Sequence, residues 1–587
     1  MSFFAELKRR KVVKVGAAYL VVAWLVIQVV ATLAPQMQLP DWVPRAITLV
    51  LLVGFPIAVV LAWVFDITPE GVVRDPGDVA ASQAATPVAS ASSIAVAALP
   101  AAITTIVPHK SIAVLPFADL SPTHDQEYFS DGIAEEILNA LVKLKDLKVA
   151  GRTSSFSFKG RNEDLRGIGK ALAVAHVLEG SVRKHGDKVR ITAQLIQVDD
   201  GYHLWSDSYD GDLSDVFELQ ERIARAITRE LDVILHGDPH QRLVPVATAS
   251  PEAYALYLQA SGIFNRRDGV RFPEAIAQLH KALELDPNFA RAHARLASIH
   301  GLEPVYVPNA SAAALVAAEH EAALAIALDP TLAEPHAALA MTHIRLRRYV
   351  DAFAAIERAL AIDADDVSAN LWGAIAFIIT GYAARGCALL DRALALDPLL
   401  PNALFWRGLQ SFYAGDVERA ETLIRRAADV GLTHAGLGLY LVLAAHGRIV
   451  EAREQLAAGL GVLGAGLPAG MANIIAAGVY GDETARTRAL TAIDDYLATQ
   501  PQWLSGNLPY ALIVLGEPRR MLQLSMRQSS NNDAACFHAL WVPQTRALRA
   551  LPEFAEFTRR VGMVAVWDRY GAPDLCHKNA VGDYVCE

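Results

Sequence analysis

The sequence ALALDP at residues 393–398 is one copy of a pattern that recurs through the second half of the chain. AIALDP at 325–330 and ALAIDA at 359–364 precede it, and the weaker copy AADVGL at 427–432 follows it, each 34 residues from the next. An earlier copy, ALELDP at 282–287, lies 43 residues before the second. The extra length predicts an insertion near residues 303–311. A regular period of this kind predicts a stacked array of similar structural units.

A 34-residue period in which a helix ends at Asp-Pro is typical of tetratricopeptide repeats. Small residues recur at a spacing of seven, where the second helix of each repeat must pack closely: Ala275 and Ala282, Ala352 and Ala359, Gly386 and Ala393, and Ala420 and Ala427. Gly408 serves the same close approach on a first helix. The sequence therefore predicts an all-α tetratricopeptide-repeat superhelix over 250–460, followed by degenerate helical repeats and a C-terminal cap over 461–587.

A superhelix of helix pairs has a concave groove, because each pair covers the apolar face of its neighbour and leaves an extended inner surface. We therefore expect a protein or peptide partner in this groove. A rigid spacer or an intrachain platform is the alternative role of such an array. The pattern predicts no oligomeric state.

The segment 111–235 has a different pattern, with short apolar runs and amphipathic helices. SIAVLPF at 111–117 is typical of a buried strand. Residues 188–198 alternate between apolar and polar side chains, as expected for a sheet with one covered face. Further strands are expected at 147–151 and 176–183, and helices after the first strand and at 162–172 and 214–231. The predicted order is β-α-β-α-β-β-α, an α/β domain.

Five stretches of this domain resemble the TolB-like domain, the unit similar to the amino-terminal domain of TolB and to FlgO. They are SIAVLPF (111–117), EYFSDGIAEEILNAL (127–141), GRTSSFSFKG (151–160), AHVLEGSVRKHGDKVRITAQLI (175–196) and HLWSDSYD (203–210). The resemblance implies an envelope-associated signalling or scaffolding protein. Its relatives often carry an adenylate cyclase or a winged-helix DNA-binding domain as well, for which we expect no room in this chain.

The α/β domain contains residues that could suggest catalysis, but their spacing favours structural roles. Arg166 to Lys170 lacks the Gly-x-x-x-x-Gly-Lys-Ser/Thr spacing of a phosphate-binding loop. Ser154, Ser155 and Ser157 have no Gly-x-Ser-x-Gly environment. We interpret Ser130, Asp131, Glu135 and Glu136 as helix-capping and first-turn residues rather than catalytic carboxylates. His176, His185 and His203 do not show metal-ligand spacing. We expect no catalytic residue, no cofactor and no metal site.

The N-terminal region predicts a membrane anchor. Residues 1–14 are basic, and apolar runs at 15–33 and 46–65 are long enough to cross a bilayer. The positive-inside rule places the basic segment in the cytoplasm. A two-helix transmembrane hairpin then returns the chain to the cytoplasm, and 66–110, which ends in a stretch rich in Ala, Ser and Pro, reads as a flexible linker. We therefore expect a multi-pass protein of the bacterial inner membrane with cytoplasmic domains; periplasmic domains are the alternative.

Two of the four cysteines lie close together at the C-terminus, in the sequence VWDRYGAPDLCHKNAVGDYVCE. Cys576 and Cys586 could form a disulfide, which requires an oxidising compartment. They could equally be two reduced thiols, or metal ligands together with His577, although a fourth ligand is missing. Cys387 and Cys536 lie in apolar helical surroundings and are expected to be buried.

Composition limits the function classes. The 587-residue chain has a net charge of −10, so nothing in its charge favours nucleic-acid binding. We therefore predict a multidomain, membrane-anchored scaffold or signalling protein rather than an enzyme. A hydrolase or nucleotide-handling enzyme with a site in the α/β domain is the alternative. A DNA-binding regulator is a third interpretation, but the sequence has no basic recognition module.

Overall fold

The structure of the chain is a computed structural model. It describes residues 108–161, 163–233, 242–307, 312–462, 467–499, 507–527 and 534–587, and the backbone of two short strands further upstream. The two strands, β1 (Phe65–Thr68) and β2 (Gly71–Arg74), pair in an antiparallel hairpin. They belong to a compact unit separate from the one formed by 103–587.

The prediction of a two-helix transmembrane hairpin is not supported by the structure. In the part of the chain that the structure describes, no helix combines the length and apolar character needed to cross a membrane. The predicted hairpin, at 15–33 and 46–65, lies outside the described residues except for Phe65, which begins β1. The prediction of a multi-pass protein of the inner membrane is not retained.

A six-stranded mixed sheet organises the residues that follow. Its strands are β3 (Ser111–Val114), β4 (Ala118–Asp119), β5 (Lys148–Val149), β6 (His176–His185), β7 (Lys188–Gln197) and β8 (His203–Asp212). The order across the sheet is β5-β3-β6-β7-β8, and β4 pairs with β6 beside β3. β3 runs parallel to its two neighbours, whereas β6, β7 and β8 form an antiparallel meander.

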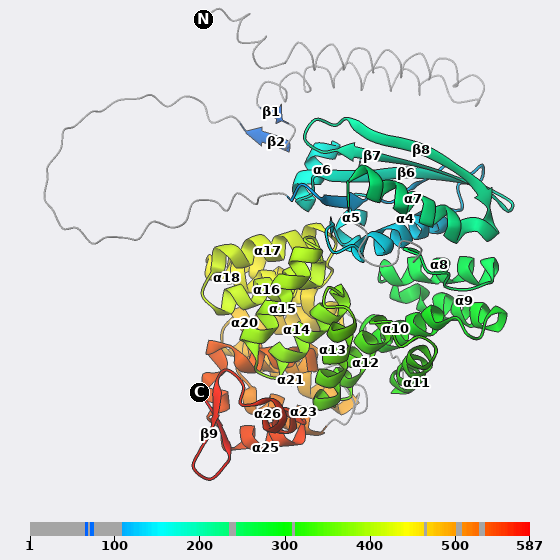
Figure 1. The fold of residues 1–587 in the computed structure, drawn as a ribbon. Coiled ribbons are helices and arrows are strands. Elements are labelled where there is room, and N and C mark those ends of the chain that lie inside the picture. Colours follow the sequence, from blue (N-terminus) through cyan, green and yellow to red (C-terminus); the bar gives the residue numbers. More distant parts are fainter. Residues whose placement is uncertain are drawn as a thin grey trace, which may run out of the picture. The chain divides into compact units, whose positions relative to one another are not determined.

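Helices cover the sheet on both faces. α4 (Glu127–Val142) and α7 (Val216–Glu230) bury apolar side chains against one face, whereas α6 (Leu165–Leu172) packs on the other, over β3 and β6 (Figure 1). Asp164 caps α6 by accepting a hydrogen bond from the backbone N–H of Arg166. The sequence pattern missed β8 and the short helix α5 (Arg152–Phe156). β8 is an edge strand whose side chains are mostly exposed, so it lacks the apolar alternation that identifies a strand.

Antiparallel helix pairs follow the sheet (Figure 1). The pairs are α8 (Pro251–Asn265) with α9 (Phe272–Leu285), α10 (Ala290–Tyr306) with α11 (Ala312–Leu328), α12 (Glu334–Arg345) with α13 (Tyr349–Ile362), α14 (Val367–Ile379) with α15 (Ala383–Leu396), α16 (Pro401–Tyr413) with α17 (Val417–Asp429), α18 (Gly436–Ala445) with α19 (Ile449–Gly461), α20 (Ala469–Tyr480) with α21 (Glu483–Thr499), and α22 (Asn507–Val514) with α23 (Pro518–Arg527). They confirm the predicted tetratricopeptide-like superhelix, and the extra residues near 303–311 fall at the end of α10 and in the connection that follows.

The small residues of the repeats lie where the period predicts. Ala275, Ala282, Ala352, Ala359, Gly386, Ala393, Ala420 and Ala427 are buried in second helices. On the first helix α16, a Cβ added to Gly408 would lie 2.5 Å from Cγ1 of Ile424 on α17. The two helices of this pair can therefore approach closely only because residue 408 has no side chain.

A C-terminal unit packs against the array. It contains the 3-10 helices η3 (Ala534–Trp541) and η4 (Pro543–Thr545), the helices α24 (Arg546–Arg549), α25 (Pro552–Arg560) and α26 (Met563–Tyr570), and the hairpin of β9 (Cys576–Lys578) and β10 (Tyr584–Cys586). η3 lies against α14 and α22, and α26 lies against α13. The end of the chain thus returns to the middle of the repeats.

Gly408→Ala tests the close approach within one pair. Alanine is the better helix former by about 1 kcal/mol, but the overpacking against Ile424 costs about 1–3 kcal/mol. We expect a lower midpoint of thermal unfolding, measured by circular dichroism. The control is Gly470→Ala on α20, where an added Cβ meets nothing within 4 Å and the midpoint should rise slightly. A rise for both variants would refute the packing role of Gly408.

Candidate functional site

The α/β part and the first repeats share one hydrophobic core. Side chains of α4 and α7 cluster with those of α8, α9 and α10. The ring of Phe217 on α7 lies 4.6 Å from that of Tyr254 on α8, centre to centre. Gln220 on α7 donates a hydrogen bond of 3.1 Å to the hydroxyl of Tyr254. The repeats therefore hold α4 at a fixed position, and the sheet does not form an independent domain.

The acidic residues of α4 are not capping residues, which corrects the sequence interpretation. α4 begins at Glu127, so Asp131, Glu135 and Glu136 lie inside the helix, beyond its N-cap position at Gln126. Glu136 forms a two-pronged ion pair with Arg291 of α10, with 2.7 Å between Oε2 and Nη1. Glu135 accepts hydrogen bonds from Arg152 at 2.7 Å and from Asn265 at 3.0 Å. Asp131 pairs with Lys159 at 2.6 Å.

Asp397, the Asp of the repeat copy ALALDP, caps a helix of the other part of the molecule. Its carboxylate accepts hydrogen bonds from the backbone N–H of Thr153 at 3.2 Å and of Ser154 at 2.7 Å, at the start of α5. The Ser154 hydroxyl also bonds to this carboxylate and accepts from the N–H of Leu399 at 2.6 Å. The N–H of Gly151 donates to the carbonyl of Leu396 at 2.7 Å. The stretch GRTSSF thus docks on the end of a repeat.

A cavity of about 720 Å³ lies between these docking contacts. Its walls are α4 and α5 on one side and the first helices α10, α12 and α14 on the other. We call it the arginine-rich cavity, after the five arginines that line it: Arg152, Arg267, Arg291, Arg295 and Arg392. Asp363, Asp365 and Asp366, in the connection before α14, line another part of its wall.

The charges of the arginine-rich cavity shift several pKa values. Burial opposes the ionisation of Glu135, but the positive charges of Arg152 and Arg295 lower its pKa below the ordinary value. Burial alone would lower the pKa of Arg291, yet the charge of Glu136 raises it well above the ordinary value. Burial raises the pKa of Asp366 to about 6, although its carboxylate accepts a hydrogen bond from the N–H of Ala369. Glu135 and Arg291 therefore stay charged at neutral pH.

The other residues considered from the sequence have structural surroundings. Arg166 to Lys170 lie within α6, where a Cβ on Gly169 would meet Val198 at 2.4 Å, so this glycine serves packing. Ser155 is buried, and Ser157 donates to the carbonyl of Ser154 at 2.8 Å. His176 is buried with Nδ1 3.1 Å from the carbonyl oxygen of Ser111, and burial lowers its pKa. His185 and His203 are exposed on β6 and β8. Among the described residues, no three His, Cys, Asp or Glu side chains form a group that could hold a metal ion.

The inner surface of the later repeats is covered by the chain itself. His538 of η3 lies against the rings of Trp406 and Tyr413 on α16 and of Tyr510 on α22, at 5.2 to 6.1 Å between centres. Trp541 of η3 donates a hydrogen bond of 3.0 Å to the carbonyl of Ile379 at the end of α14. The groove predicted from the repeats is therefore divided, and the arginine-rich cavity is its part beside α4.

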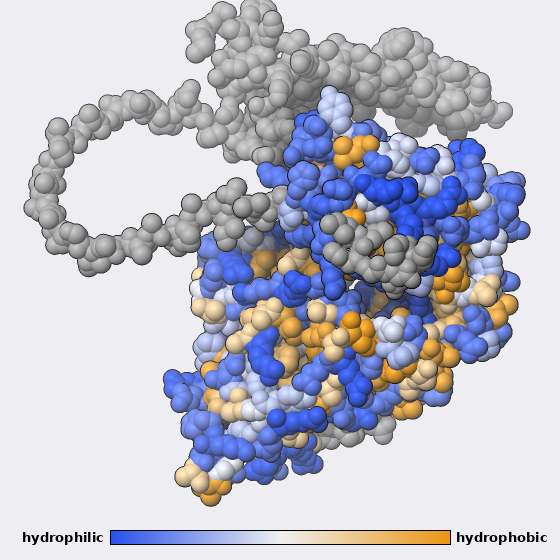
Figure 2. Space-filling model, in the orientation of Figure 1, coloured by the Kyte–Doolittle hydropathy of each residue, from blue (hydrophilic) through white to orange (hydrophobic). Residues whose placement is uncertain are grey.

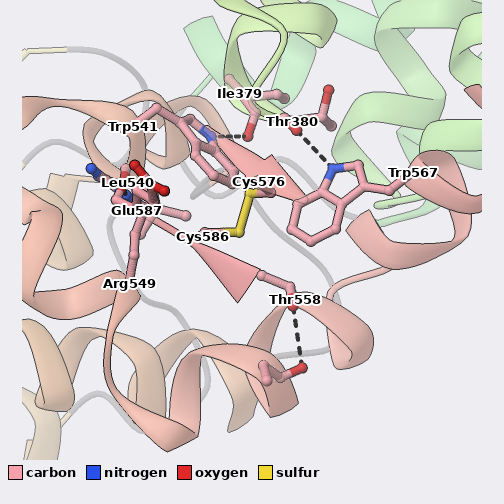
Figure 3. Close-up of a disulfide and its surroundings, with 11 residues drawn as sticks. Ile379, Thr380, Leu540, Trp541, Arg549, Thr558, Trp567, Cys576, Cys586 and Glu587 are labelled. Atoms are coloured by element: carbon pink, nitrogen blue, oxygen red, sulfur yellow. Dashed lines mark hydrogen bonds between the residues drawn. A yellow bond between two sulfur atoms is a disulfide. The ribbon is translucent and has the colours of Figure 1, made fainter. Parts of the chain in front are cut away.

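The C-terminal tail anchors on the turn between α14 and α15. Trp567 donates to the carbonyl of Thr380 at 2.9 Å, and the carboxylate of Asp574 accepts from the N–H of Ala384 at 2.8 Å. In Figure 3 the two indoles of Trp541 and Trp567 reach the end of α14 from either side of the C-terminal hairpin. These contacts satisfy the last carbonyls of one helix and the first N–H groups of the next.

A disulfide joins Cys576 to Cys586 across β9 and β10 (Figure 3). Both cysteines are buried at the edge of the main core, and the ring of Trp567 packs on Tyr584 at 5.1 Å between centres. Arg549 donates to the carbonyl of Glu587 at 2.6 Å and so fastens the last residue. Cys387 is a half-buried free thiol, whereas the side chain of Cys536 lies outside the described residues.

On one face of the molecule, the two parts differ in polarity. On the face drawn in Figure 2, the α/β part is mostly hydrophilic, and hydrophobic residues gather over the helical repeats. The open face of β7 and β8 carries the ion pair of Arg190 and Asp210, at 2.6 Å.

Comparison with protein families gives a match for the sheet and its helices. Residues 108–226 match the family described as the second domain of HilA/YgeH-like transcriptional regulators. This is not the TolB-like family that the sequence resembles. The protein named putative adenylate cyclase 3 from Rhizobium meliloti (strain 1021) is 41% identical over 189 residues, which are 32% of each chain. The chain thus spans about a third of the length of this curated relative.

Solved structures that resemble the chain are repeat proteins. A crystal structure of PilW, a type IV pilus biogenesis factor, is 22% identical and covers 35% of this chain and 90% of its own, with a TM-score of 0.28. YrrB, described as a TPR protein with an unusual peptide-binding site, is 18% identical over 34% of this chain and 93% of its own, with a TM-score of 0.23. A human IFIT1 dimer with PPP-AAAA is 14% identical over 59% and 78%, with a TM-score of 0.36. Scores this low carry no argument about function.

Gly151→Ala tests the docking of α5 on the repeats. An added Cβ would lie 2.5 Å from Cβ and Cγ of Asp397, so the carboxylate must leave the N–H groups of Thr153 and Ser154. We expect faster amide hydrogen exchange in 152–156 and a lower midpoint of thermal unfolding. The control is Gly167→Ala on α6, where an added Cβ meets nothing. Unchanged exchange in the first variant would show that Asp397 does not hold α5.

Asp366→Asn tests the raised pKa at the acidic wall. The folded pKa of about 6 exceeds the ordinary 3.8, so the folded state binds more protons than the unfolded state between these values. Asp366 therefore costs stability increasingly as pH rises through this window. Asparagine keeps an oxygen for the N–H of Ala369 but carries no charge. We expect a higher midpoint than wild type at pH 7.5 and a much smaller difference at pH 4; equal gains at both would contradict the shift.

Proposed function

We propose that this chain is a protein-interaction scaffold that binds a short peptide segment of its partner in the arginine-rich cavity. The observation that carries the proposal is the cavity itself, which the first helices of three successive repeats form together with α4 and α5. Concave surfaces of repeat arrays are where such proteins present their binding sites. The volume of about 720 Å³ lies in the range of ligand-binding clefts.

The rest of the groove is unsuited to a partner, because η3 already fills it at Trp406, Tyr413 and Tyr510. This restricts a bound segment to the space beside α10, α12 and α14. The α/β part then serves as one wall of the binding site. Its resemblance to the TolB-like domain remains part of this proposal, as a unit with a recognition role.

A catalytic role is the second candidate, and one observation bears on it. The acidic side chains that could act in catalysis are engaged in ion pairs, with Glu135 held by Arg152 and Glu136 held by Arg291. Their charges hold the sheet against the repeats and are not free to exchange protons with a substrate. We therefore propose binding rather than catalysis as the role of this cavity.

The test is selection of random dodecapeptides on the full chain, followed by fluorescence anisotropy with the enriched sequences. Asn139→Trp, on the α4 wall of the cavity, should weaken their binding at least about tenfold, or ~1.4 kcal/mol. Val142→Trp, on the same wall and 38% exposed, is a second blocking variant that leaves the core untouched. Val450→Trp on α19, 66% exposed, is the control outside the cavity.

The outcomes separate clearly. Loss of binding in both blocking variants with full binding in the control supports the proposal. If no peptide is enriched, or if Asn139→Trp and Val142→Trp bind as well as wild type, the cavity is not a peptide site. Circular dichroism of each variant confirms that the helices are intact.

A further inference from the structure

Not all of the five arginines that line the arginine-rich cavity have an ion-pair partner. Arg152 pairs with Glu135 at 2.7 Å and Arg291 pairs with Glu136. Arg295 pairs with Glu334 at 2.9 Å between Nε and Oε1. Arg392 pairs with Asp365. The fifth, Arg267, forms no ion pair with a carboxylate of the described residues, and only Glu334 acts on its charge from a longer distance.

Arg267 is held in place without using its donors fully. It lies in the turn after α8 with a left-handed backbone, at φ +56°. Its guanidinium lies over the ring of Phe264, 4.2 Å from the centre, and donates one hydrogen bond of 3.3 Å to the carbonyl of Phe264. A guanidinium has five N–H donors, so most of them remain available to a ligand.

Arg295 beside it also has unused capacity. The residue is only 7% exposed. Its Nε contacts Oε1 of Glu334 at 2.9 Å, but the hydrogen bonds of its two Nη atoms to Asn265 and to Oε2 of Glu334 measure 3.4 and 3.5 Å. These are long for hydrogen bonds to a charged group. Burial and the charges of Arg295 and Arg152 lower the pKa of Arg267, against the opposing effects of Tyr306 and Glu334. The three guanidiniums therefore repel one another across the cavity, and an anion would relieve this repulsion.

We propose that the partner segment is acidic and that one of its carboxylate side chains pairs with Arg267 in the arginine-rich cavity, beside Arg295 and Arg152. This inference rests on the proposed function. A carboxylate matches the planar fork of a guanidinium in two parallel hydrogen bonds. The carboxylates of Asp363 and Asp366 disfavour a second acid on that side, whereas Asp365 is paired with Arg392. The expected segment carries an acid at one position and neutral or basic residues further along.

The experiment uses arrays of random hexapeptide mixtures with the third position fixed as Glu, Gln, phosphoserine or Lys. The full chain should retain the Glu mixture about tenfold more than the Gln mixture. Arg267→Gln should abolish this preference without lowering retention of the Gln mixture. Arg267→Gly, which suits the left-handed backbone, is the second variant. Arg266→Gln is the matched control, because Arg266 lies in the same turn but does not line the cavity.

Each outcome decides the inference. Preference for Glu in wild type and in Arg266→Gln, but not in either Arg267 variant, supports it. Equal retention of Glu and Gln mixtures that Asn139→Trp still blocks overturns the acidic partner and leaves the peptide site standing. Stronger retention of phosphoserine than of Glu overturns the carboxylate assignment. If wild type retains no mixture above Asn139→Trp, the proposed function fails together with the inference.

Discussion

The buried carboxylate of Asp397 links the two halves of the described structure. It is 2% exposed, and burial raises its pKa although the N–H groups and hydroxyl of α5 lower it. A carboxylate in such a position is costly unless its oxygens are hydrogen-bonded. Thr153 and Ser154 supply those bonds only when α5 sits at the end of α15. The position of α5, of Arg152 within it and of the cavity wall all depend on this contact.

The repeats could be predicted from the sequence because their signal is local and periodic. Ala352 and Ala359 are seven apart because one helix face must be small, and the same requirement recurs every 34 residues. β7 could be predicted for a similar reason, since alternate residues face the core. β8 could not be predicted in this way. Only Tyr209 among its side chains is buried, because the strand lies at the edge of the sheet and most of its side chains face solvent.

The candidate site escaped prediction because its partners are far apart in the sequence. Glu136 and Arg291 are 155 positions apart, and α5 is a five-residue helix whose cap lies about 240 positions away. A local reading assigns Asp131, Glu135 and Glu136 to helix capping, which is the usual role of acids near a helix start. Two arginines four apart on α10, Arg291 and Arg295, were the available signal. They face the concave side of a repeat, where a charged pair needs a partner.

The concave surface of a repeat superhelix is long. In this chain, other elements of the same chain cover it over the first repeats and over the later repeats. η3 covers the later repeats with His538 and Trp541, and α4 covers the first ones with its acidic face. Each covering element matches the repeat surface on which it packs. Aromatic rings of η3 pack on aromatic rings, whereas carboxylates of α4 pair with guanidiniums. The carboxylates of α4 do not pair with every arginine of the cavity. Arg267 has no ion-pair partner among them. A half-buried charge without an ion-pair partner is unfavourable in a folded chain, and this cost supports the proposal that a ligand neutralises Arg267.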